Sequence, residues 1–138
     1  RVIVSFSDPL PRHDHKGNVI TPGHIGAIYQ ARNAWYLGRN ASKWHHLTPE
    51  GHFLSQRALS KIRNQEQGHE GAMRTLLNHG APPRKPGEAP DAWVARALKE
   101  GPFTRVQHPG NHVYLWVLDP SATAGIAVQK YPKKQAAA

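Results

Sequence analysis

With 138 residues and no cysteine, the chain is long enough for one domain and excludes disulfide bonds, thiolate zinc sites and a cysteine nucleophile. Eighteen Lys and Arg residues against nine Asp and Glu residues give a net charge of +9, which favours a polyanionic partner such as nucleic acid. No apolar stretch reaches the roughly 20 residues of a membrane span, so we expect a soluble protein without a membrane partner.

The chain begins with an apolar run that predicts a buried strand. Val-Ile-Val at residues 2–4 leads into Ser-Phe-Ser-Asp-Pro at residues 5–9, so polar side chains follow at the end of the strand. Alternation puts Ser5 and Ser7 on one face, and Asp8 lies where the chain leaves the sheet. The Asp8 carboxylate can orient a base, bind an amine or ligate a metal, or it can cap the turn before proline. Because the sequence opens in this strand without methionine, we expect the C-terminal part of a longer protein.

A helix is predicted over residues 25–34, after an exposed loop or small hairpin over residues 9–23. Ile25, Ile28 and Tyr29 follow helical spacing and face the sheet. A tyrosine at this place can return a proton to a departing thiolate, which is the general acid that thioester transfer needs. It can equally be a core residue with its hydroxyl at the rim.

The remaining chain predicts further strands and a group of helices. We expect a strand at 34–37 and a hairpin at 44–54 that turns at 48–51. Helices are expected at 55–64, 70–79 and 90–100. Two strands follow at 103–107 and 112–118 around a turn at 108–111, and then a mobile or loosely docked basic tail at 119–138. Ser55 is the predicted N-cap of the first of these helices.

Basic and aromatic residues indicate where nucleic acid can bind. Arg57, Lys61 and Arg63 lie on the helix expected at 55–64, where they can reach a phosphate backbone. Trp44, flanked by histidines and a basic residue, is the tryptophan best placed to stack on a base, although core packing explains most tryptophans.

Ten histidines raise the question of a metal site, with groups at residues 13–15, at 45–46 and at His52. No pair has the helical i, i+4 spacing of metalloproteases, so we expect scattered surface histidines and no metal. The exception is His24, which can approach Asp8 to form a carboxylate–imidazole pair or part of a metal site. Neither the Gly-x-Ser-x-Gly elbow nor a phosphate-binding P-loop is present, which disfavours hydrolase and nucleotidase functions.

The segment over residues 25–38 resembles the later half of the GNAT acyltransferase fold, and Tyr29 falls on the general-acid tyrosine of that family. The closer resemblance is to the phage Mom-like branch, whose members modify adenine in DNA. The matching positions are Ser5, Asp8, Gly23, His24, Tyr29, Gln30 and the strand at 110–114, where Val113 replaces an arginine. The resemblance covers about residues 1–64 and 103–118. The glycine-rich turn with which GNAT proteins bind the donor pyrophosphate is missing from the sequence, so either it precedes Arg1 or the donor is not an ordinary acyl-coenzyme A.

The resemblance implies an α/β fold, a GNAT-like mixed β-sheet flanked by helices, with a single domain over residues 1–118 and a helical insert at 55–100. It implies transfer of a small group to an amino group of adenine in double-stranded DNA, from a donor of the acyl-coenzyme A type or another activated donor. The implied location is the cytoplasm of a cell that hosts a phage or mobile element. The expected catalytic residues are Ser7, Asp8, His24 and Tyr29, with Asp8 orienting or activating the acceptor and Tyr29 supplying the proton. Two alternatives remain: a non-catalytic basic module that binds nucleic acid, and acetylation of a small amine or a protein.

Overall fold

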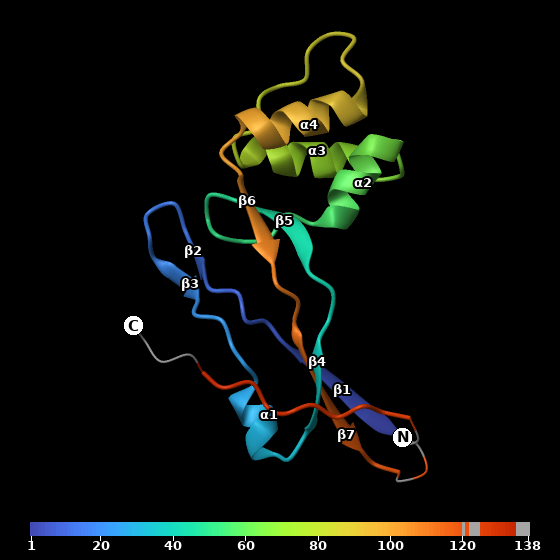
Figure 1. Ribbon diagram of the computed structural model, residues 1–138. Helices are drawn as coiled ribbons and strands as arrows, with labels where there is room; N and C mark the ends of the chain where they lie inside the picture. The colour runs from blue at the N-terminus through green and yellow to red at the C-terminus, as the bar shows by residue number, and fades with distance from the viewer. Residues whose placement is uncertain (120, 122–124, 135–138) are drawn as a thin grey trace. The chain divides into compact units, whose positions relative to one another are not determined.

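The computed structural model describes residues 1–119, 121 and 125–134 (Figure 1). The chain mixes α-helices with antiparallel β-sheets and divides into two compact units. The first unit contains residues 1–12, residues 21–43 and the chain from His108 onward, and the second contains residues 13–20 and 44–107. The first unit closes with strands from both ends of the described chain, since β1 (Val2–Ser7) pairs with β7 (His112–Val117).

The first unit is built on a three-stranded antiparallel sheet. Strand β7 (His112–Val117) lies in the centre, between β1 (Val2–Ser7) and β4 (Trp35–Arg39). In this register Ser7 lies opposite His112, and Tyr114 lies between Ser5 of β1 and Tyr36 of β4. Directly opposite residues share a face of the sheet, so both strand-end serines lie on the face that carries these aromatic and imidazole side chains.

Strand β1 forms as predicted, but the expectation that it is buried is wrong. Val2, Ile3 and Val4 are 42%, 49% and 46% exposed, and only Ser7 of this strand is buried. Apolar β-branched residues favour a strand through their fit to a pleated surface, whereas burial also needs other elements packed over the faces of the sheet. Among the described residues, the hydrophobic cluster of the first unit includes none from β1.

Helix α1 (Ala27–Ala31) follows a loop and is shorter than the predicted helix at 25–34. Gly26 precedes it at a φ of +82°, and Asn33 follows at a φ of +54°. Both values lie in the left-handed region, which a right-handed helix cannot include, so the helix is confined between them.

An aromatic cluster forms the core of the first unit. The buried residues Ala34, Tyr36 and Tyr114 pack with Tyr29 and Trp116. The described part of the expected tail contacts the same region (Figure 1). Gln129 forms a bridge with Tyr36, the Tyr131 hydroxyl donates to the carbonyl of Ala34 over 2.6 Å, and the Gln30 side chain donates to the carbonyl of Pro132 over 3.3 Å.

The second unit contains the helices expected in the 55–100 insert. They are α2 (Gln56–Asn64), α3 (His69–Asn78) and α4 (Pro90–Glu100). Ser55 caps α2 by accepting a hydrogen bond from the amide of Ala58, as predicted, and Pro90 begins α4. The core lies between these helices and centres on Trp93, whose indole donates to the carbonyl of Pro82 over 2.9 Å.

The strand pairing after residue 100 differs from the prediction. Strands β6 (Thr104–His108) and β7 form near the expected positions, but they do not pair with each other. Strand β6 pairs with β5 (Lys43–Leu47), while β7 enters the sheet of the first unit. The turn between them is held instead by Asn40, whose side chain accepts from the amide of Asn111 over 2.7 Å. Local turn chemistry predicts that the chain bends there but not which strand each segment then meets.

Two smaller predictions concern the loops. Strands β2 (Arg12–His13) and β3 (Val19–Thr21) form a small hairpin inside the expected loop. The turn at 48–51 is present, with the Gly51 amide donating to the carbonyl of Thr48 over 2.9 Å. The returning segment of that predicted hairpin reduces to a bridge between Leu47 and Phe53 in the described chain, while β5 pairs with β6.

Candidate functional site

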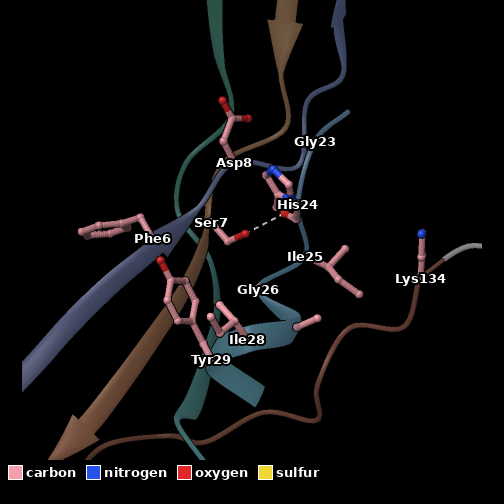
Figure 2. A pocket seen from close by; sticks show the side chains of 11 residues that line it. Phe6, Ser7, Asp8, Gly23, His24, Ile25, Gly26, Ile28, Tyr29 and Lys134 are labelled. Carbon is pink, nitrogen blue, oxygen red and sulfur yellow. Dashed lines mark hydrogen bonds between the residues drawn. The ribbon is translucent and has the colours of Figure 1, made fainter. Parts of the chain in front are cut away.

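A pocket of about 560 Å³ in the first unit brings together the four predicted catalytic residues (Figure 2). It lies where β1 ends and α1 begins, and its size is within the range of about 300–1,000 Å³ typical of ligand sites. It is lined by Ser7, Asp8, His24 and Tyr29 together with Phe6, Gly23, Ile25, Gly26, Ala27, Ile28 and Lys134. Apolar groups dominate this lining, so a partly apolar ligand fits its chemistry.

The loop that carries His24 is fixed to the end of β1. The buried Ser7 hydroxyl donates to the carbonyl of His24 over 2.7 Å, and the His24 amide donates to the carbonyl of Asp8 over 2.7 Å. His24 therefore meets Asp8 through the backbone, and no carboxylate–imidazole hydrogen bond joins them among the described contacts. The imidazole of His24 is exposed and faces the pocket, where it is accessible to a ligand.

The carboxylate of Asp8 binds groups outside the pocket. Its Oδ1 accepts from the amide of Leu10 and from Nε2 of His108, each over 2.9 Å, and its Oδ2 lies 3.5 Å from the Arg12 guanidinium. Figure 2 shows this carboxylate directed away from Ser7 and Tyr29. Asp8 thus caps its turn, which was one of the two roles considered from the sequence, and also holds an imidazole and an arginine.

His108 is a site residue that sequence reasoning missed, because it was placed in a turn. It is buried, and its Nδ1 accepts from the amide of Gly110 over 3.0 Å. An accepting Nδ1 carries no hydrogen, so the hydrogen sits on Nε2 and points at Asp8. Nothing in the local sequence signals this contact, which depends on the path of the chain between two distant segments.

Tyr29 stands on α1 between two aromatic rings. The centroids of Tyr114 and Trp116 lie 5.4 Å from its own, and Figure 2 shows its hydroxyl directed toward the pocket wall formed by Phe6 and Ser7. The flanking rings fix the plane of the phenol while leaving the residue partly exposed to the pocket. The two sequence interpretations of Tyr29, proton donor and core residue with an accessible hydroxyl, therefore describe the same position.

Tyr114 fixes the start of α1 and was also missed by sequence reasoning. Its hydroxyl donates to the carbonyl of Ile25 and accepts from the side chain of Gln30 over 3.0 Å. A Cβ atom at Gly26 would collide with the Tyr114 ring, so only glycine permits this close packing. Burial raises the pKa of Tyr114, which keeps its hydroxyl protonated as a donor.

A buried hydrogen bond joins β4 to β7. The Tyr36 hydroxyl is 2.7 Å from Nδ1 of His112, and Nε2 of His112 has no hydrogen-bond partner among the described residues. Burial lowers the pKa of His112, and the charge of Arg39 lowers it further. Burial also raises the pKa of Tyr36. His112 lies opposite Ser7 in the sheet. Burial of the Tyr36–His112 pair disfavours the charged form of either side chain.

The predicted nucleic-acid-binding residues lie in the second unit and differ in their surroundings. Arg57 forms an ion pair with Glu66 over 2.7 Å, and Lys61 is partly buried, whereas Arg63 is exposed. Trp44 is 50% exposed, and the guanidinium carbon of Arg105 lies 3.9 Å from the centroid of its ring. The structure therefore joins Trp44 to an arginine that sequence reasoning did not select.

The histidine groups do not converge on a metal site. Within the described part of the chain, no three His, Cys, Asp or Glu side chains are placed to hold a metal ion. The same residues include no helix long and apolar enough to cross a membrane. Comparisons with protein-family models, curated proteins and solved structures give no match to this chain. The GNAT-like and Mom-like assignments therefore stay predictions that rest on the sequence resemblance.

Proposed function

We propose that this protein is a transferase that modifies an amino group of a DNA base, adenine, by a GNAT-type mechanism. The observation that supports it is the shared pocket, in which the His24 imidazole and the Tyr29 phenol face the same space at the end of β1. A transfer of this kind needs one group to accept a proton from the amine and another to return a proton to the leaving group.

The proposed roles follow from the contacts of each side chain. The amino nitrogen attacks the activated carbonyl carbon of the donor, so a nitrogen–carbon bond forms and the bond to the leaving group breaks. His24 takes the proton released by the amine, and Tyr29 gives its proton to the leaving group. Ser7 and Asp8 are positioning residues, because Ser7 holds the His24 loop and Asp8 holds its own turn.

The donor supplies the activated acyl group, and the pocket offers features that suit both substrates. Lys134 provides a positive charge for an anionic part of the donor, while the apolar lining suits an acyl group or the face of a base. A base in duplex DNA is inaccessible to such a pocket, so the proposal requires the target adenine to be flipped out of the helix.

The test is mass spectrometry of nucleosides from the DNA of cells that express the open reading frame encoding this chain. Tyr29→Phe is expected to lower adenine modification by about a hundredfold, from the usual contribution of a general acid, while DNA affinity stays within a factor of two. Tyr131→Phe is the matched control, because its hydroxyl binds a backbone carbonyl outside the pocket. Unmodified adenine in the presence of the wild-type protein contradicts the proposal.

A second candidate, a non-catalytic nucleic-acid-binding module, is favoured by one observation. The exposed Trp44 and its neighbouring arginine lie in a unit that contributes no residue to the pocket. A binding module needs only this surface and the net charge of +9. Under this alternative, wild type and Tyr29→Phe bind DNA equally and neither modifies it.

A further inference from the structure

The two-stranded β5–β6 sheet of the second unit carries an exposed tryptophan beside an arginine. Half of the Trp44 surface is exposed, and the Arg105 guanidinium lies over its ring. The helical core of this unit is filled without it, around the fully buried Trp93. An exposed indole leaves a large apolar surface in water, so its position suits contact with a ligand better than support of the core.

Positive charge gathers around this tryptophan. Trp44 and His46 lie two residues apart on β5 and therefore on the same face of the strand. Burial lowers the pKa of His46, and the charges of Arg105 and Arg63 lower it further. Among the described residues, neither arginine forms an ion pair with a carboxylate, whereas Arg57 is neutralised by Glu66. An arginine without an ion-pair partner in the described chain thus lies over an exposed aromatic ring.

We propose that Trp44 and Arg105 form a stacking site for an unpaired nucleobase of DNA. Aromatic rings stack on any base, and arginine adds cation–π attraction and phosphate binding. An acidic protein surface requires the arginine alone and leaves the ring without a role, so the combination favours nucleic acid. The inference rests on the proposed function for the identity of the polymer, because an enzyme that flips a base acts on DNA with unpaired nucleotides.

The test measures binding of a fluorescently labelled single-stranded oligodeoxyadenylate by anisotropy at fixed salt. Trp44→Ala is expected to weaken binding by about tenfold, and Trp44→Phe, which keeps an aromatic ring, retains most of the affinity. Arg105→Ala is expected to weaken it by a similar factor. Arg74→Ala is the matched control, since Arg74 is exposed on α3 of the same unit and forms no ion pair within the described chain.

An abasic strand with the same phosphates separates stacking from charge. On that strand, Trp44→Ala is expected to bind as wild type does, because no base is present to stack. Equal affinity of Trp44→Ala and wild type for oligodeoxyadenylate overturns the proposal. A loss of affinity of Trp44→Ala for the abasic strand that equals its loss for oligodeoxyadenylate also overturns it. A loss for Arg74→Ala as large as that for Arg105→Ala also overturns it, since it shows general charge attraction. If binding depends on Trp44 but adenine stays unmodified in cells, the stacking site stands and the transferase proposal fails.

Discussion

The imidazole of His108 donates its Nε2 hydrogen to Oδ1 of Asp8 over 2.9 Å, between residues one hundred positions apart in the sequence. This bond connects the end of β6 to the end of β1, both within the first unit. It gives the carboxylate a structural role at the end of β1, in agreement with the turn-capping role considered from the sequence. The groups left facing the pocket are the imidazole of His24 and the phenol of Tyr29.

Replacing Asp8 by Asn tests this structural role. The amide oxygen of Asn can still accept from His108 and from the Leu10 amide, but its NH2 group cannot accept from the Arg12 guanidinium, which lies 3.5 Å from Oδ2 of Asp8. We therefore expect the free energy of unfolding to fall by about 1–3 kcal/mol. Urea denaturation followed by circular dichroism measures the change. Glu70→Gln, which removes one exposed charge without an ion-pair partner in the described chain, controls for net charge. Equal stability of Asp8→Asn and wild type contradicts the role.

Gly26 is expected to tolerate no side chain. Gly26→Ala combines a left-handed backbone, at a φ of +82°, with a collision between the new Cβ and the Tyr114 ring. Gly17→Ala is the matched control, because Gly17 has a φ of +84° and open space around its Cβ position. We expect a loss of about 1–2 kcal/mol for the control and about 1–3 kcal/mol more for Gly26→Ala, by thermal or urea unfolding. Equal losses would show that the Tyr114 ring moves aside freely.

The buried His112 is expected to make the protein less stable in mild acid. Its pKa is lowered from 6.5 in the folded state, so the unfolded chain binds the proton more readily. Stability is therefore fully present above about pH 6.5 and falls as the pH drops from that value toward the folded pKa, by at most about 1.4 kcal/mol per pH unit for one proton. His112→Gln should flatten this slope in urea titrations between about pH 7 and 5. His52→Gln, at an exposed histidine, serves as the control, and an unchanged slope in His112→Gln contradicts the assignment.

The second unit has an acid-sensitive contact of its own. Hydrogen bonds from Arg96 and the Lys85 amide lower the pKa of Glu88 from 4.5 to about 2. The stability that this carboxylate supplies is present above about pH 4.5 and is lost as the pH falls toward 2. Glu88→Gln should remove this part of the acid transition. The transition is measured by tryptophan fluorescence as the pH is lowered. A wild-type acid transition in Glu88→Gln would show that the ion pair adds nothing to the folded state.

Local sequence patterns determined most helices and strands of this protein. Ser55 and Pro90 begin helices α2 and α4 where predicted, because N-caps and N-terminal prolines act on the backbone groups next to them. The order of residues at 2–9 likewise predicted strand β1 and a polar strand end. These features depend on neighbours within a few positions, and a single sequence contains that information.

Only the tertiary structure decided which segments meet. Strand β7 joins β1 and β4 instead of β6, which places His112 opposite Ser7. The same long-range pairing brings His108 to Asp8 and Tyr114 to the start of α1. The sequence by itself therefore determined the backbone elements and the residue types of the candidate site. The geometry of that site was decided by long-range contacts, because their stability depends on packing across the whole unit and local propensity does not encode it.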